Sequence, residues 1–438
     1  MSAPTRERYH TRAGSLVLTE RSAVLPVVGV GVSVRTGSLL DPAGKEGLSR
    51  LMARAMRMGT AEIRSQKLEE TIDAMGAQLG ISCSQSYMHF GGVVVAHNLE
   101  PFVRLLASLI ERPALRPADV RQVQREMIAE LTSLCDDDRA LCSRHFRMYA
   151  FGGHPYGRPR SGFRKTLRAI TQRDVLAQHA RHITAENLVL GVWGDFEPRA
   201  LRRLLDGCFG RLPSRKPPEL AIAEPVLPEG RRVRVIDKPE RTQTQILIGT
   251  LGTSAHDRDH VPLIVGNAAF GGLFTSRLTE EVRGKRGLSY GASSAFTLSR
   301  TRDLWSMHTF PAATDARACI ELQLGLYDEW LERGVRAREL VAVKRYLVKG
   351  HPFEVDTAAK RLDQHLDIEL FGWPKTHHSH FLPRVRTTTR ESVLRAVQRR
   401  MSRRDQVITL VATADQVLPE LRKLPGVDHV EVVPFDDI

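Results

Sequence analysis

A proline-rich segment near the middle of the chain constrains the fold more than any other feature. The segment reads GRLPSRKPPELAIAEPVLPEG, covers residues 210–230, and has proline at positions 213, 217, 218, 225 and 228. Prolines at this density exclude the interior of a helix or sheet and favour an extended tether. We therefore expect the 438-residue chain to fold as two bodies of similar length joined by a linker.

The two halves of the sequence also resemble each other in pattern, which indicates an internal duplication. Each half opens with a stretch rich in β-strand-forming residues and continues with a predicted helix about twenty residues later. Each half ends with an amphipathic helix followed by a predicted strand. The paired segments are 14–38 and 231–254, 45–56 and 260–270, and 176–198 and 394–416.

This pattern predicts an α+β protein with two homologous domains. The first covers residues 1–212, the linker covers 213–230, and the second covers 231–438. In each domain we expect a mostly antiparallel sheet packed against helices, because hairpin-like neighbouring strands are mixed with long helices.

The composition is that of an ordinary globular protein, with 42% hydrophobic and 26% charged residues. The formal net charge of +14 favours acidic partners. The arginines are spread along the chain without a long basic block, so a solvated surface is the simplest interpretation. An acidic protein partner comes next, and we expect no nucleic-acid partner.

Cysteine usage and hydropathy indicate a reducing, aqueous compartment. The five cysteines are an odd number and include no CxxC pair, which argues against a disulfide framework. The first residues, MSAPTRERYHTRAG, precede no apolar stretch of signal-peptide type. No run approaches 18 apolar residues, so we expect a cytoplasmic protein without membrane contact.

Residues 46–60, EGLSRLMARAMRMGT, predict a short helix with an unusual polar face. Apolar residues recur at helical spacing and form its buried stripe. Arg50, Arg54 and Arg57 lie on the opposite side, four and three residues apart. Like charges at this spacing cost a few tenths of a kcal/mol each, so the arginines require an explanation.

A second candidate site lies in the second half, in NAAFGGLFTSRLTEEVRGKRGLSYGASSAF, residues 267–296. The pattern predicts a helix that carries Arg283, a glycine cap at Gly287, and a strand that begins near Tyr290. A cation beside a phenolic donor can hold a peptide carbonyl or a developing oxyanion. The alternative is that Arg283 pairs with Glu280 and that the Tyr290 hydroxyl is satisfied in the sheet.

The segment SRLTEEVRGKRGLSYGASS resembles the hallmark C-terminal segment of the pitrilysin/insulinase family of zinc metallopeptidases. In that family an arginine and a tyrosine lie seven residues apart, as Arg283 and Tyr290 do here. Further stretches resemble family landmarks in the expected order, so the resemblance covers nearly the whole chain. These stretches are residues 152–159, 183–198, 236–246 and 341–374.

The resemblance also explains the arginine-bearing helix. Active members carry H-x-x-E-H there, with two histidine zinc ligands and a glutamate that activates water. In this chain the three positions hold Arg50, Ala53 and Arg54, and the family's third ligand matches Glu130. Neither arginine nor alanine offers a lone pair to zinc, so we expect no metal in this chain. Our hypothesis is an ion-pair network of Arg50, Arg54 and Glu130, and the alternative is a face that drifted after catalysis was lost.

Some family members are heterodimers, and the resemblance implies the second subunit of such a pair. One subunit binds zinc, the other supplies the arginine and tyrosine, and the two close like a clamshell around peptide substrates. By this resemblance Arg283 and Tyr290 are catalytic in trans, binding substrate and stabilising the transition state, and zinc is held by a homologous catalytic partner. The alternative is a catalytically inactive structural or peptide-binding homodimer of the same fold.

Overall fold

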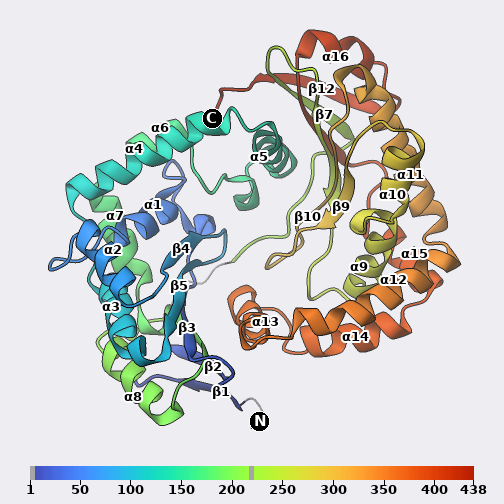
Figure 1. Cartoon of the computed structure of the whole chain (residues 1–438). Helices are drawn as coiled ribbons and strands as arrows, with labels where there is room; N and C mark the ends of the chain where they lie inside the picture. Colours follow the sequence, from blue (N-terminus) through green and yellow to red (C-terminus); the bar gives the residue numbers. More distant parts are fainter. Residues whose placement is uncertain (1–4, 217–220) are drawn as a thin grey trace. The chain divides into compact units, whose positions relative to one another are not determined.

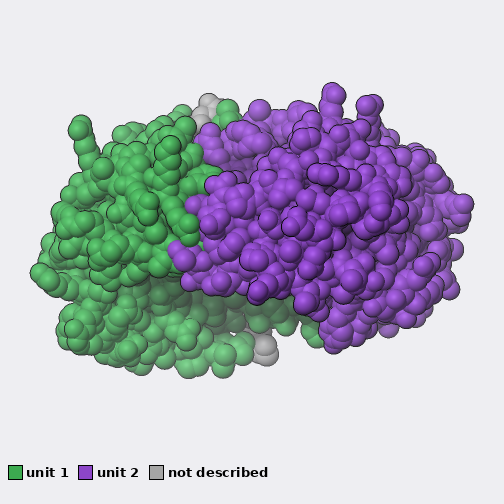
Figure 2. All heavy atoms as spheres, turned by 90° about the horizontal axis from the view of Figure 1, so that it is seen from above, with its two compact units in different colours: residues 1–131, 159–221, 352–373 green, residues 132–158, 222–351, 374–438 purple. Residues whose placement is uncertain are grey.

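The computed structural model describes residues 5–216 and 221–438 (Figure 1), so residues 217–220 of the predicted linker lie outside the described residues. The chain forms two compact units, coloured separately in Figure 2. Unit 1 comprises residues 1–131, 159–221 and 352–373, and unit 2 comprises residues 132–158, 222–351 and 374–438.

The units differ from the predicted sequence halves in two segments. Residues 132–158 come from the first half but belong to unit 2, and residues 352–373 come from the second half but belong to unit 1. Each segment carries one helix, α5 (Asp138–Phe151) in the first and α13 (Ala358–Phe371) in the second. Each helix packs on a sheet whose strands come from the other half of the sequence.

Unit 1 is built on a six-stranded sheet in the order β1-β2-β6-β3-β5-β4. Only β2 and β6 pair in parallel, and the other neighbours are antiparallel. The strands are β1 (Thr5–His10), β2 (Leu16–Arg21), β3 (Val27–Val34), β4 (Gly80–Cys83), β5 (Met88–Val95) and β6 (Leu188–Gly194). Besides α13, the helices are α1 (Leu48–Met56), α2 (Ser65–Ala74), α3 (Leu99–Glu111), α4 (Pro117–Leu134), α6 (Arg164–Ala169), α7 (Gln172–His182) and α8 (Pro198–Phe209).

Unit 2 is built on a second six-stranded sheet in the order β12-β7-β11-β8-β10-β9. Strand β7 pairs in parallel with β12 and β11, and the remaining pairs are antiparallel. The strands are β7 (Arg231–Asp237), β8 (Gln245–Leu251), β9 (Ala292–Phe296), β10 (Leu304–Thr309), β11 (Gln406–Ala412) and β12 (Val427–Pro434). Besides α5, the helices are α9 (His260–Asn267), α10 (Arg277–Thr279), α11 (Ala316–Arg333), α12 (Ala337–Gly350), α14 (His377–Thr387), α15 (Arg390–Arg400) and α16 (Ala414–Leu421).

The predicted fold class, α+β with two similar domains and a mostly antiparallel sheet in each, is confirmed. From the second strand onward the two sheets have the same order, because β2-β6-β3-β5-β4 corresponds to β7-β11-β8-β10-β9. The exchanged helices occupy corresponding places in the two repeats, since α5 follows α3 and α4 as α13 follows α11 and α12. The outermost strands differ, because β1 is antiparallel to its neighbour and β12 is parallel.

Helix α13 docks on the sheet of unit 1 through an apolar stripe. Leu362, Leu366 and Leu370 form a buried cluster with side chains of β2 and β6. Leu366 lies over Gly191, where an added Cβ would come within 2.9 Å of its methyl carbon. A larger residue at position 191 would therefore displace the helix.

A buried ion pair fixes the same helix at its other side. Glu20 of β2 is 1% exposed and accepts hydrogen bonds from Arg361 of α13 and from Arg6 of β1. Two arginines around one buried carboxylate compensate for its desolvation.

Helix α5 docks on the sheet of unit 2 as α13 docks on the sheet of unit 1, with a bulky apolar side chain packed over a strand glycine. The Phe146 ring lies over Gly249 of β8, where an added Cβ would come within 2.7 Å of the ring. Behind this sheet the core is aromatic, with Phe270 stacked on Trp330 at 4.8 Å and Trp305 stacked on Tyr327 at 5.1 Å between ring centroids.

The positive charge of the chain is concentrated on three helices of unit 2. Residues 336–351 and 374–404, which contain α12, α14 and α15, hold 14 Lys or Arg and two Asp or Glu, and so carry +12 of the net +14. Helix α14 packs against α12, and α9 contacts both α14 and α15. The other 50 Lys and Arg lie elsewhere in the chain together with 48 Asp and Glu, so the basic residues are distributed along the chain while most of their excess over acidic residues falls in these two segments. The two basic segments are separated in sequence by residues 352–373, which belong to unit 1.

Among the described residues, the structure contains no helix that combines the length and the apolar character needed to cross a bilayer.

Candidate functional site

Helix α1 carries the residues that the sequence resemblance matches to the family's zinc motif. Its N-terminus is held by Asp41, whose carboxylate accepts hydrogen bonds from the backbone amides of Gly47 at 2.9 Å and Ser49 at 2.8 Å. Burial raises the pKa of Asp41 to about 6. The predicted apolar stripe of α1 is buried, and the three arginines lie on its opposite face.

All three arginines are paired with carboxylates of neighbouring helices in unit 1. Glu130 of α4 accepts from Nη2 of Arg50 at 2.8 Å and from Nη1 of Arg54 at 2.5 Å. Arg54 also pairs with Glu126 at 2.9 Å, and Arg57 pairs with Glu69 of α2 at 2.7 Å. The arginines therefore do not face one another as uncompensated charges.

The ion-pair network hypothesised from the sequence is thus present, and it includes one member that sequence reasoning missed. Glu126 lies one helical turn before Glu130 on α4, so both carboxylates face α1. The spacing of these two glutamates is the signal that would have identified it.

This arrangement does not fit a zinc ion. Both carboxylate oxygens of Glu130 are engaged by guanidinium groups, and a guanidinium has no lone pair to offer a metal. At the position of the water-activating glutamate, Ala53 is 1% exposed and carries no polar group. In the part of the chain that the structure describes, no group of three or more His, Cys, Asp or Glu side chains could hold a metal ion.

The Arg/Tyr segment lies in unit 2 and has irregular helical geometry. Residues Ala268–Gly272 and Glu280–Lys285 are single π-helical turns that flank the short helix α10. Such turns are rare in proteins, and those that occur are often found at functional sites. The second π-turn carries Arg283, and Tyr290 lies two residues before β9.

The structure brings Arg283 and Tyr290 together, as the sequence predicts. The guanidinium carbon of Arg283 lies 4.6 Å from the centroid of the Tyr290 ring. The same guanidinium carbon lies 4.8 Å from the centroid of the Phe274 ring. Both rings are exposed, Tyr290 by 79% and Phe274 by 74%.

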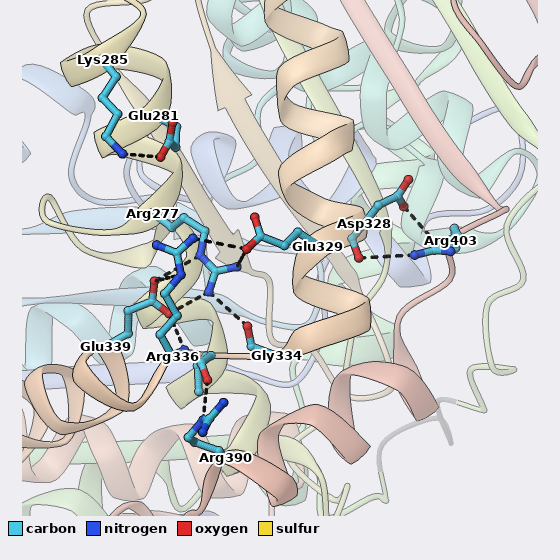
Figure 3. Close-up of polar contacts among 11 residues, drawn as sticks. Arg277, Glu281, Lys285, Asp328, Glu329, Gly334, Arg336, Glu339, Arg390 and Arg403 are labelled. Atoms are coloured by element: carbon cyan, nitrogen blue, oxygen red, sulfur yellow. Dashed lines mark hydrogen bonds and ion pairs between the residues drawn. The ribbon is translucent and has the colours of Figure 1, made fainter.

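The alternative pairing of Arg283 with Glu280 is not what the structure shows. Lys285 forms ion pairs with both glutamates, because its Nζ lies 2.6 Å from Oε1 of Glu281 and 3.4 Å from Oε1 of Glu280 (Figure 3 shows the Glu281 pair). Hydrogen bonding to Glu281 raises the pKa of Lys285, which keeps this competing cation charged. Within the described residues, Arg283 forms no ion pair and no hydrogen bond.

The first arginine of the same segment, Arg277, has a structural role instead. It is 3% exposed and forms a two-point ion pair with Glu339 of α12, while its Nη2 also donates to the carbonyl oxygen of Gly334 at 3.1 Å (Figure 3). Arg277 therefore ties α10 to α12, and the π-turn that carries Arg283 begins three residues later.

Phe274 is the residue of this site that sequence reasoning missed. It stands two residues after Gly272, at the end of the first π-turn. The sequence carries no clear signal for it, because the exposure of its ring and its contact with Arg283 are known only from the structure.

Sequence models of two related families match successive parts of the chain. The model of the insulinase family (peptidase family M16) matches residues 16–162, and the model of the peptidase M16 inactive domain matches residues 169–347. The chain belongs to the insulinase family. Its arginines at the zinc-ligand positions make it a non-catalytic member of that family.

Two curated bacterial proteins are similar to this insulinase-family chain over most of its length. An uncharacterized zinc protease of Mycobacterium leprae is 28% identical over 294 residues, which are 65% of this chain and 64% of that protein. A protein of Helicobacter pylori named non-peptidase homolog YmxG is 21% identical over 372 residues, which are 84% of this chain and 85% of that protein.

A solved structure shows the same fold over almost the whole chain. The crystal structure described as the peptidase M16 inactive domain from Pseudomonas fluorescens superposes with a TM-score of 0.86 at 23% sequence identity. The match covers 93% of this chain and 98% of that one.

Proposed function

We propose that this chain is the non-catalytic subunit of a heterodimeric zinc metalloendopeptidase. In this proposal a homologous partner subunit holds the zinc ion and the water-activating glutamate. The present chain supplies Arg283 and Tyr290, which bind the peptide backbone and stabilise the negative charge that develops on the carbonyl oxygen.

The observation that carries this proposal is the state of Arg283. The neighbouring cations Arg277 and Lys285 are neutralised by glutamates, whereas the guanidinium of Arg283 lies over two exposed rings and has no carboxylate partner among the described residues. An unneutralised guanidinium beside an exposed phenol offers the donors that an oxyanion needs. A scaffold would gain little from keeping a cation in this condition.

The chemistry assigned to this chain needs no metal of its own. The guanidinium donates N–H groups to a peptide carbonyl and so fixes the direction of the peptide backbone, and the Tyr290 hydroxyl donates a second hydrogen bond. Both interactions strengthen as the carbonyl oxygen gains negative charge, so they stabilise the transition state more than the bound substrate.

The basic helices of unit 2 support an acidic partner. Along α12, Arg338, Arg345 and Lys349 lie on one exposed face with Val341 and Tyr346, each of which is 59% exposed. Within the described residues these three cations have no ion-pair partner. A surface of cations with exposed apolar side chains fits an acidic protein surface better than it fits plain solvent.

A cytoplasmic location agrees with the thiols of the chain. All five cysteines are free, and the burial that raises the pKa of Cys83 to about 12 and the pKa of Cys319 to about 11 makes these thiols unreactive. Free, unreactive thiols are typical of proteins from reducing compartments.

The first experiment identifies the partner by native purification of the tagged chain from its own cells and mass spectrometry. A near-stoichiometric family member of similar size that carries H-x-x-E-H is the expected result. Recovery of this chain alone, as a self-associated species that binds peptides without cleaving them, would replace the proposal with an inactive homodimer.

The second experiment measures peptide hydrolysis by the reconstituted pair. We expect Arg283→Ala and Tyr290→Phe to lower kcat by about 10²-fold while the two subunits still co-elute in gel filtration. Arg422→Ala is the matched control, because it removes an exposed arginine at the end of α16 in unit 2, away from the basic helices and from the Arg/Tyr segment. Unchanged turnover in both site variants would remove the catalytic role.

A further inference from the structure

We propose that Phe274 is a positioning residue for Arg283, and that its ring, with the ring of Tyr290, holds the guanidinium in place by stacking. The inference rests on the function proposed for Arg283. The guanidinium carbon lies 4.8 Å from the Phe274 centroid and 4.6 Å from the Tyr290 centroid. Both distances are within the roughly 6 Å over which a cation is attracted to an aromatic face.

Two aromatic rings can order the Arg283 side chain and leave its N–H donors free for substrate, which a carboxylate partner could not do. A flexible arginine side chain at the surface must be ordered before it can orient a substrate, and an ion pair would order it. An ion pair would also consume its N–H donors and neutralise its charge, so a carboxylate would compete with the substrate. An aromatic face attracts the cation and leaves the in-plane N–H groups of Arg283 free.

The surroundings of Arg283 show that carboxylates are kept from it. Glu280 and Glu281 lie three and two residues before it, yet both pair with Lys285. Phe274, in contrast, is 74% exposed and contributes little to the core. The ring of Phe274 therefore makes its contact at the surface and not in the core, and that contact is with the guanidinium of Arg283.

The backbone places Phe274 where this contact requires it. At Gly271, an added Cβ would lie 2.4 Å from Oγ of Ser294, so the first π-turn runs directly against β9. At Gly272, an added Cβ would lie 3.0 Å from Nδ2 of Asn267. The segment that leads to Phe274 therefore runs against β9, and Tyr290 lies two residues before that strand, so both rings come from chain segments next to one strand.

The test separates the ring of Phe274 from its apolar volume. Phe274→Leu removes the aromatic face and keeps a branched apolar side chain, and Phe274→Trp restores a face. In the reconstituted peptidase we expect Phe274→Leu to lower kcat about two- to five-fold with little change in KM, and Phe274→Trp to restore kcat. A raised KM with unchanged kcat would show direct substrate contact by Phe274 and would overturn a positioning role.

A second readout needs no activity. In the isolated chain, the rate of phenylglyoxal modification at Arg283 is followed by peptide mass spectrometry, with Arg338 and Arg395 of the same sample as internal references. Contact with the two aromatic faces shields the guanidinium, so we expect Phe274→Leu to raise the Arg283 rate two- to five-fold and Phe274→Trp to leave it unchanged. An Arg283 rate that is the same in the wild type and Phe274→Leu would overturn the inference.

The two proposals fail in different ways. If Arg283→Ala leaves turnover unchanged while Phe274→Leu raises the modification rate of Arg283, the positioning role is supported and the catalytic role is lost. If Arg283→Ala abolishes turnover while Phe274→Leu changes neither the rate of modification nor kcat, the positioning role is overturned and the catalytic role is supported.

Discussion

Arg54 and Glu130 form a direct ion pair, with Nη1 of the arginine 2.5 Å from Oε1 of the glutamate. Arg50 occupies the other oxygen of the same carboxylate. The sequence resemblance matches these three residues to the family's zinc ligands, and in this chain they form a charge-balanced contact between α1 and α4. A face that had merely drifted would not be expected to bring both arginines onto one carboxylate.

Glu130→Gln is expected to destabilise unit 1 by about 1 kcal/mol, because Arg50 and Arg54 would lose their shared counter-charge and repel each other at i, i+4 spacing. All three side chains are roughly one-third exposed, which limits the size of the effect. Urea unfolding measures the change. Glu70→Gln, which breaks the more exposed pair with Lys67, is the control and should cost less than about 0.5 kcal/mol. Equal effects in the two variants would favour the drifted face.

Replacing the arginines by histidine should restore metal binding. We expect Arg50→His/Arg54→His to bind zinc stoichiometrically, because two imidazoles on one helix face would join a Glu130 freed from its ion pairs. The wild type should bind none. Metal analysis after dialysis measures both, and adding Glu130→Gln to the double variant should weaken the binding. Stoichiometric zinc in the wild type that is lost on Glu130→Gln would contradict our interpretation of this site.

Arg277 and Glu339 form a buried pair whose loss should be costly. Arg277→Met leaves Glu339 partly buried without its main partner, so we expect a loss of about 3–5 kcal/mol in the unfolding free energy of unit 2. Arg277→Met/Glu339→Leu should recover a large part of this loss, because no charge is then left unpaired. A double variant as unstable as the single one would show that Arg277 acts mainly by packing.

The same pair predicts a loss of stability at acid pH. Burial alone would raise the pKa of Glu339, but hydrogen bonds from Arg277 and from the backbone of Arg336 outweigh it, and the pKa is lowered below the ordinary 4.5. A lowered carboxyl pKa contributes stability above pH 4.5 that is lost as the pH falls below this value. Glu339→Gln should therefore flatten the pH dependence of unfolding below pH 4.5, and identical slopes in the variant and the wild type would contradict this assignment.

The duplicated fold could be predicted from the sequence because the repeated elements are long and regularly spaced. The exchange of α5 and α13 could not, because an apolar stripe such as Leu362, Leu366 and Leu370 shows that a helix is buried but not which sheet buries it. The role of Gly191 and Gly249, which make room for a bulky side chain of the docked helix, could not be predicted without knowing which helix covers each strand.

The candidate site was partly predictable for a similar reason. The sequence places Arg283 and Tyr290 seven residues apart, and turn chemistry then brings them together. Whether Glu280 pairs with Arg283 or with Lys285 depends on a π-turn that no local pattern specifies. Phe274 was missed because an aromatic residue after a glycine pair is far more often part of a core than of a surface site.

Buried histidines should make this protein sensitive to acid, and His260 provides the clearest case. Its ring is 3% exposed and lies 5.2 Å from the ring of His377, so burial first, and then the charges of His377 and Arg384, lower its pKa to about 3. Similar burial lowers the pKa to about 4 at three further positions, namely His145, His182 and His308.

A histidine with a lowered pKa favours the folded state fully only above its ordinary pKa of 6.5. Below that pH the unfolded chain binds a proton that the folded chain does not, so the unfolding free energy falls by up to about 1.4 kcal/mol per pH unit for each such group. His260→Phe keeps an aromatic ring and removes the titration. We therefore expect its unfolding free energy, measured in urea at pH 7, 6, 5 and 4.5, to fall less steeply than that of the wild type. His182→Phe should act likewise in unit 1, and parallel curves for the wild type and both variants would show that these rings are protonated in the folded protein.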